Sequence, residues 1–149
     1  MVTFTGTYKR ETETGYDDFL KKLGVGMLMR KGATASTPTM VVTESGGKWK
    51  IVTSTTLRSI EINFEAGTPF KETTADGREC NTTVTLDGNT MTTNQVPVKA
   101  GQKEVKVIRE FSEEGISVQC ICDDVTSVAF FTRQPWNIYF LFYVFIIGP

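Results

Sequence analysis

The chain has 149 residues, with 16 basic and 17 acidic side chains for a net charge of −1, and it contains no histidine. Its length fits a single domain with one hydrophobic core. The balanced charge argues against a nucleic-acid-binding protein, because such proteins usually have a clearly basic face. The absence of histidine excludes Ser-His and Cys-His nucleophiles and histidine-ligated zinc. Threonine is the commonest residue, beside many valines and phenylalanines, so the composition favours an all-β protein that is not an enzyme.

The N-terminal part of the chain predicts one strand followed by two short helices. The strand spans residues 4–10, and nothing before it has the basic and apolar stretches of a secretory signal, so we expect a cytosolic protein. Residues 16–23 place four large apolar side chains on one helical face: Tyr16, Phe19, Leu20 and Leu23. A second helix is expected over residues 27–35, although Gly32 weakens it.

From residue 39 onward, short strands alternate with turns that are rich in Gly, Asp, Asn or Pro. The turns are at residues 45–47, 67–69, 75–77, 87–89, 100–101, 113–115 and 123–124. This regular spacing is typical of hairpins in an antiparallel barrel or sandwich. Polar residues occur on both faces of the strands, whereas a solid sandwich would give each strand one apolar face. The pattern therefore favours a barrel whose interior holds ligand and water.

Arg109 is the sharpest single signal in these strands. Lys106 and Glu110 share one face of their strand and mark it as outward, so Arg109 is expected to point inward among apolar neighbours. A buried guanidinium keeps its charge and is costly without a partner. Two explanations remain open from the residues alone. Either a nearby acidic side chain or water satisfies Arg109, or a carboxylate ligand binds it through charge-assisted hydrogen bonds.

Three cysteines, Cys80, Cys120 and Cys122, fit a reducing compartment. Cys120 and Cys122 lie two residues apart on one strand, where packing as small hydrophobic side chains is easier than bridging each other. No further cysteine pair or histidine accompanies them, so we expect neither a metal site nor a cofactor.

A series of motifs resembles the intracellular lipid-binding protein family, the fatty acid-binding proteins of the calycin superfamily. The motifs are in the same order and spacing as in that family and cover residues 4–134. They are Gly6-Thr7-Tyr8, residues 15–26, Pro38-Thr39, Ala75-Asp76-Gly77-Arg78, residues 83–89, Val107-Ile108-Arg109-Glu110-Phe111 and Asp124-Val125-Thr126.

The resemblance implies a ten-stranded antiparallel up-and-down β-barrel, shaped like a clam, with a two-helix cap between the first and second strands. It implies that Arg109 contacts the ligand carboxylate. The other ligand-binding positions are Tyr16, Leu20, Thr53, Ala75, Asp76, Gln95 and Phe131, and the portal positions are Met27, Met29, Ala33, Pro38 and Leu57. Core packing is the alternative role for the apolar residues, and a role in a turn is the alternative for Asp76.

The sequence departs from the family pattern on its last strand. The family carries an Arg-x-Tyr pair there that completes the carboxylate site, and Ala129 and Phe131 stand at these two positions. The head group would then depend on Arg109, with water, Gln95 or Thr53 as helpers, so we expect weaker or differently placed binding. Arg10 is a second departure, because the family signature has an aliphatic residue at that position.

We therefore expect residues 1–134 to be a lipid-binding barrel and residues 135–149 to be an atypical apolar tail. Three origins of the tail remain open: a terminus without function, a strand or plug against the barrel, or an interfacial anchor. It is too short to span a membrane as a helix.

The function we expect is that of a monomeric intracellular carrier of long-chain fatty acids or similar hydrophobic carboxylates. A carrier of retinoids or other hydrophobic ligands, or a membrane- or protein-docking variant that acts through the tail, are the alternatives. The resemblance also places Lys21, Arg30 and Lys31 at basic cap positions that family members use for transient membrane contact or nuclear import, so a nuclear location accompanies the cytoplasmic one. A solvated surface is the simpler role for these charges.

Overall fold

The structure is a computed structural model that describes residues 2–135, so the predicted tail lies outside the described residues apart from Pro135. It contains ten antiparallel strands in one sheet and two helices, which confirms the predicted fold class. The elements in chain order are β1 (Gly6–Thr14), α1 (Tyr16–Lys22), α2 (Met27–Ala35), β2 (Thr39–Ser45), β3 (Lys48–Ser54), β4 (Ser59–Glu65), β5 (Phe70–Thr73), β6 (Glu79–Asp87), β7 (Thr90–Pro97), β8 (Val105–Phe111), β9 (Gly115–Cys122) and β10 (Val125–Arg133).

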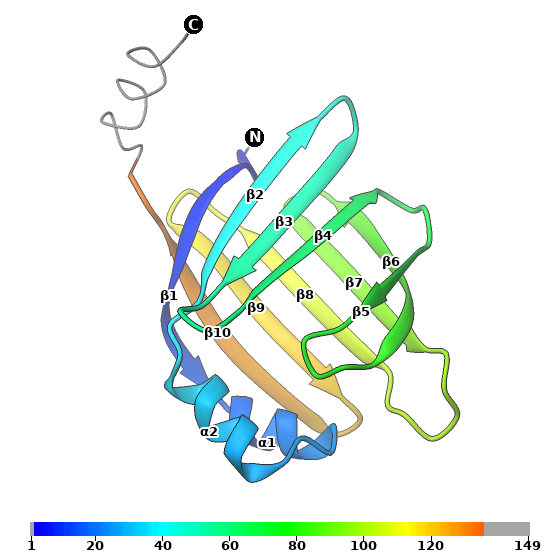
Figure 1. Cartoon of the computed structure of the whole chain (residues 1–149). Helices are drawn as coiled ribbons and strands as arrows, with labels where there is room; N and C mark the ends of the chain where they lie inside the picture. Colours follow the sequence, from blue (N-terminus) through cyan, green and yellow to red (C-terminus); the bar gives the residue numbers. More distant parts are fainter. Residues whose placement is uncertain (1, 136–149) are drawn as a thin grey trace, which may run out of the picture.

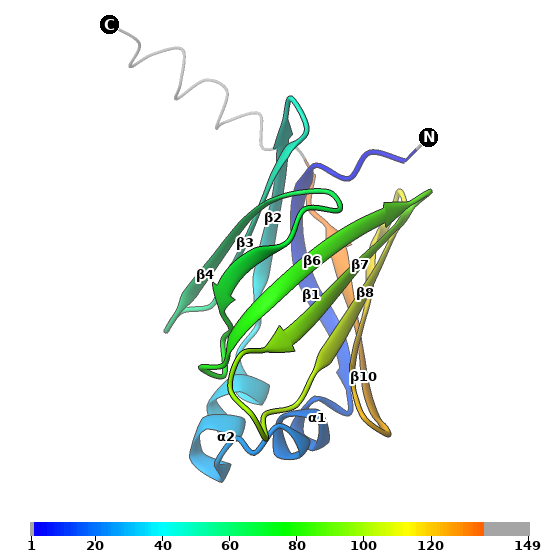
Figure 2. The ribbon, with the colours of Figure 1, turned by 90° about the vertical axis from the view of Figure 1, so that its right-hand side faces the viewer.

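The sheet curls into a barrel whose spatial order follows the chain, except where β1 pairs with β10. The full order is β4-β3-β2-β1-β10-β9-β8-β7-β6-β5, so β4 and β5 form the two edges of the sheet. Both helices lie at one end of the barrel, and the β2–β3 hairpin lies at the other (Figures 1 and 2). None of the helices in residues 2–135 is long and apolar enough to cross a membrane.

The first strand differs from its predicted range, because it runs from Gly6 to Thr14 and not over residues 4–10. Its second half is polar and gives no apolar alternation, yet it pairs with β10 up to Thr14↔Val128. The pairing contains an irregularity between Arg10 and Thr12, after which Glu13 lies opposite Ala129. Tertiary pairing therefore extends a strand that the local pattern does not mark.

The helical cap forms where the sequence predicts it. Phe19 and Leu20 are the buried residues of α1, which packs against β10 and β9, and α2 packs against α1. The cap begins at Gly15, whose φ of 79° is left-handed and favours glycine. A Cβ atom there would also lie 3.0 Å from the Thr126 carbonyl oxygen of β10. Gly15 therefore allows close contact between the cap and the barrel wall.

The interior is not filled by side chains. One buried cluster includes Tyr8, Val42 and Ile116 on the strands and extends to Phe19 and Leu20 on α1. Several other residues are paired across the sheet with inward-facing residues and are only half-buried. They are Thr53, Ile60, Ile62, Gln95, Arg109, Cys120 and Ala129. A solid core would bury them fully. The mixed polarity of the strand faces thus reflects a hollow barrel, as the sequence suggests.

Candidate functional site

Arg109 lies on the inner face of β8. Its partners across the ladders, Met91 on β7 and Val118 on β9, are both buried, whereas Lys106 and Glu110 on the other face are exposed. The predicted inward direction of Arg109 agrees with this arrangement. Cross-strand partners share one face of a sheet.

The guanidinium of Arg109 is only partly satisfied. Its Nη1 donates a hydrogen bond of 3.0 Å to Thr93 Oγ1, and its Nε is buried without a hydrogen-bond partner among the described residues. Within residues 2–135 it forms no ion pair with a carboxylate. Burial lowers the pKa of Arg109, against the opposing effects of Cys120 and Glu72. An arginine nevertheless stays charged at neutral pH, so an uncompensated donor is available inside the barrel.

A second group of interior polar side chains, joined to one another and not hydrogen-bonded to Arg109 among the described residues, lies toward the β5–β6 turn. Gln95 Nε2 donates 2.9 Å to Glu72 Oε1, and its own oxygen accepts from Arg78 Nη2 at 3.1 Å. The second oxygen of Glu72, Oε2, is buried without a hydrogen-bond partner in the part of the chain that the structure describes. Burial raises the pKa of Glu72, and the nearby Thr82 side chain, the Gln95 hydrogen bond and the charges of Arg109 and Arg78 offset this rise in part. Gln95 is therefore an interior polar group at a predicted site position.

Asp76 belongs to the turn that follows β5. Its carboxylate accepts from Thr74 Oγ1 at 2.7 Å and from Arg78 Nε at 2.7 Å. Burial acts to raise the pKa of Asp76, but the hydrogen bonds from Arg78 and Thr74 outweigh it and hold that pKa below its usual range. The structure places Asp76 in this turn, and contact of Asp76 with a ligand stays a prediction. Its neighbour Ala75 is exposed, and its carbonyl oxygen accepts a hydrogen bond from Arg58 Nη1.

Tyr16 and Leu20 place the helical cap against the interior. Leu20 is buried and Tyr16 is half-buried, with its ring stacked on Phe19 at 5.9 Å between centroids. Burial is the main cause that raises the pKa of Tyr16 to about 12. The phenol is therefore protonated and can donate a hydrogen bond at any physiological pH.

The remaining predicted positions divide into inner and outer groups. Phe131 is 5% exposed and pairs with Ile116 and Arg10, and Thr53 pairs with the buried Met40. Ala33 and Pro38 are half-buried near the cap. The other portal residues are largely exposed and lie on α2 and on the turn between β3 and β4, at the helical end of the barrel: Met27, Met29 and Leu57.

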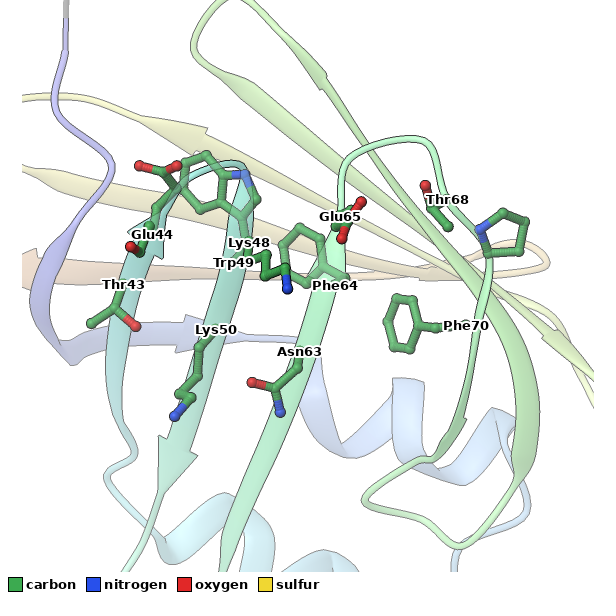
Figure 3. Close-up of a pocket in the computed structure, with 12 residues that line it drawn as sticks. Thr43, Glu44, Lys48, Trp49, Lys50, Asn63, Phe64, Glu65, Thr68 and Phe70 are labelled. Carbon is green, nitrogen blue, oxygen red and sulfur yellow. The ribbon is translucent and has the colours of Figure 1, made fainter.

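A pocket of about 620 Å³ lies away from all of these positions, against β2, β3, β4 and the start of β5. Its aromatic side chains lie in a row, with Trp49 and Phe64 stacked at 6.3 Å and Phe64 and Phe70 at 6.1 Å (Figure 3). No predicted site residue lines it. The pocket lies at the edge of the sheet where β4 and β5 do not pair. The gap between these two strands is therefore lined in part by apolar side chains.

Sequence reasoning missed several inner polar residues. Glu72, Arg78, Thr82 and Thr93 face the same interior as Arg109. In the sequence, Thr82 lies two residues from the apolar Cys80 and Val84, and Thr93 lies two residues from Met91, so period-two alternation marks both as inner positions. No such signal exists for Glu72, because β5 is only four residues long.

A helix-capped antiparallel barrel with a hollow interior and buried charged groups defines a carrier of small hydrophobic ligands. A family model described as "Lipocalin / cytosolic fatty-acid binding protein family" matches residues 5–111. The chain belongs to this family, whose members are lipid-binding carriers.

Individual relatives agree with this assignment. A fatty acid-binding protein of Tyrophagus putrescentiae is 42% identical over 134 residues, which cover 90% of this chain and all of that protein. Cellular retinoic acid-binding protein 1 of Takifugu rubripes is 34% identical over 137 residues, with the same coverage. Among solved structures, the fatty acid transporter REP1-NXSQ superposes with a TM-score of 0.82 at 35% identity, over 89% of this chain and 97% of that one.

Proposed function

We propose that the chain carries long-chain fatty acids or similar hydrophobic carboxylates in its barrel, with the carboxylate held by Arg109. The observation behind this proposal is the buried Nε of Arg109, which has no partner among the described residues. A ligand carboxylate would supply the missing acceptor and the opposite charge. Burying the acyl chain in the barrel would contribute about 0.8 kcal/mol for each methylene.

The carrier is proposed to act as a cytoplasmic monomer, in which residues 1–134 form the lipid-binding unit and residues 135–149 are an addition to it. The last strand ends at Arg133, and the Gln134 amide nitrogen still donates 2.8 Å to the Thr7 carbonyl oxygen. Gln134 is therefore the last residue that is fastened to the barrel in the described part of the chain.

Displacement of a fluorescent fatty acid by oleate tests the role of Arg109. We expect Arg109→Gln to weaken oleate binding about tenfold or more, because hydrogen bonds to charged groups contribute about 1.5–3 kcal/mol. Lys106→Gln is the matched control, since Lys106 lies on the outer face of the same strand. Oleate affinity that is equal in both variants would remove Arg109 from the site.

A retinoic acid carrier is the second candidate, supported by the 34% identity to a protein with that name. Both ligands are carboxylates and both fit the Arg109 argument. Competition between oleate and all-trans retinoic acid would separate them, with retinol as the uncharged control. Retinoic acid bound at least tenfold more tightly than oleate would favour this candidate.

A further inference from the structure

Arg10 is a second interior arginine, which lies on β1. Its register partner on β10 is the buried Phe131, which in turn pairs with Ile116 on β9. The neighbours Lys9 and Glu11 are exposed, whereas Arg10 is half-buried. Because cross-strand partners share a face, Arg10 points to the inside of the barrel.

The charge of Arg10 has no carboxylate partner in the described part of the chain. Its Nη2 donates to the carbonyl oxygen of Ser36 at the end of α2, and this is the only hydrogen bond of its guanidinium in residues 2–135. Two other arginines differ, because Arg78 pairs with Asp76 and Arg30 pairs with Asp17. A guanidinium carries five N–H donors, so most donors of Arg10 are left for another acceptor.

Arg10 and Arg109 lie on neighbouring rows of inner positions. Arg109, Val118, Ala129 and Glu13 form one row across β8, β9, β10 and β1, and Arg10 lies one inner position further along β1. Three strand spacings amount to about 14 Å along the wall, which the curvature of the barrel shortens. The apolar Ala129 and Phe131 supply no charge between the two arginines.

Cys120 lies on the row of Val107 and Ser127, on the other side of the Arg109 row from Arg10, and Tyr16 is the first residue of α1. The positive charge of Arg10 acts to lower the pKa of Tyr16, against the burial that raises it, and Cys120 also acts on Tyr16. Burial likewise raises the pKa of Cys120, whose thiol lies near enough to Arg109 for that charge to oppose it. The carboxylate of Glu13 is already used, since it accepts a hydrogen bond from the Tyr16 backbone nitrogen.

We propose that Arg10 is a ligand-contacting residue, and that its guanidinium and that of Arg109 hold one ligand carboxylate from opposite sides with the Tyr16 hydroxyl as a third donor. This inference rests on the proposed function, to which it adds the identity of the second cation. It explains how a site with Ala129 and Phe131 on its last strand retains two positive charges. It also places the acid group between the cap and the β8 wall.

A double-mutant cycle tests this arrangement with two ligands of equal chain length, oleate and oleyl alcohol. The variants are Arg10→Leu, Arg109→Gln and the combination, with Lys9→Gln as the control on the outer face of β1. We expect Arg10→Leu to weaken oleate about tenfold and the alcohol less than threefold. The combined loss for oleate should be smaller than the product of the single losses, because both groups contact one carboxylate.

Arg10→Gln is measured beside Arg10→Leu, so that folding does not decide the result. Leucine fits the apolar row of Phe131 and Ile116, and glutamine keeps a donor for the Ser36 carbonyl. The measured quantity is the ratio of oleate to alcohol affinity, which loss of an α2 anchor would not change. An unchanged ratio in both variants overturns the role of Arg10. If Arg109→Gln alone lowers the ratio, the proposed function stands without Arg10, and if neither substitution lowers it, the proposed function fails too.

Discussion

Glu72 is the interior residue whose titration should be visible in the stability of the whole protein. One of its carboxylate oxygens is buried and has no hydrogen-bond partner within residues 2–135, and burial raises the pKa of Glu72 above the ordinary value of 4.5. The folded chain then binds more protons than the unfolded chain between that value and the raised pKa. Stability therefore falls as the pH rises through this window.

We predict that Glu72→Gln removes this fall in stability. The variant should gain stability over wild type at pH 7.5, and this gain should exceed the gain at pH 5 by on the order of 1 kcal/mol. The amide can keep a hydrogen bond to Gln95 without an unpaired charge. Urea unfolding at both pH values measures the change. Glu61→Gln is the control, because Glu61 is exposed on the outer face of β4 and its pKa is lowered, chiefly by a hydrogen bond from Asn63. The same pH dependence in wild type and Glu72→Gln would contradict the prediction.

Single residues on long strands were predictable, and contacts between distant strands were not. The alternation of Lys106, Arg109 and Glu110 was enough to place Arg109 inside. Its contact with Thr93 requires the register of β7 against β8, which no local pattern contains. The inward direction of Arg10 likewise depends on the pairing of β1 with β10.

The pairing of β9 with β10 depends on the absence of a side chain at Gly115. The sequence pattern places it in a turn, but it is the first residue of β9 and is buried. A Cβ atom there would lie 2.0 Å from the Phe131 carbonyl oxygen and 3.0 Å from the Phe130 ring. The first contact is with backbone, so β9 and β10 would have to separate.

We predict that Gly115→Ala destabilises the protein by about 2 kcal/mol or more, as overpacking does in well-packed regions. Gly32→Ala is the matched control, because nothing lies within 4 Å of its Cβ position on α2. That substitution should stabilise the helix by up to about 1 kcal/mol. Chemical denaturation of both variants gives the comparison, and a Gly115→Ala variant as stable as wild type would show that the two strands tolerate the separation.

At the scale of elements, the helices and most turns followed from the sequence, because apolar periodicity and glycine act locally. Residues 27–35 form a helix despite Gly32. Residues 96 and 97 belong to β7, since pairing with β6 extends this strand to Pro97. Short β5 had no pattern of its own and is defined by its pairing with β6.

The molecule as a whole exposes apolar side chains at its helical end. Leu28 is 85% exposed and Leu57 is 83% exposed, with Met27 and Met29 beside Leu28 on α2. The turn that carries Leu57 lies at the same end of the barrel as α2 (Figures 1 and 2). Such side chains suit transient contact with a lipid surface.

We predict that combining Leu28→Glu with Leu57→Glu slows transfer of a fluorescent fatty acid to phospholipid vesicles several-fold, while equilibrium affinity changes little. The charged side chains would resist burial in the lipid interface. Thr43→Glu is the control, an exposed position on β2 toward the opposite end of the barrel. Stopped-flow transfer at increasing vesicle concentration measures the effect. A rate that is independent of vesicle concentration in wild type would exclude transfer by membrane contact.

The barrel as a whole was predictable because strands and turns alternate regularly, and the family resemblance supplied the number of strands and the cap. Two details were not predictable. The barrel implies that β1 closes on β10, but not the register of that pairing. The pocket beside Trp49 arises where β4 and β5 fail to pair.

The missing pairing between β4 and β5 also has a consequence for folding order. If the chain were opened between these strands and Gln134 were linked to the start of β1, every hydrogen-bonded strand pair would connect neighbours in sequence. The contact that now spans most of the chain, between β1 and β10, would become local. Chains with mostly local contacts fold faster. A circularly permuted chain could therefore begin at this gap between β4 and β5. Its strands would then follow one another in the sheet in the same order as in the sequence.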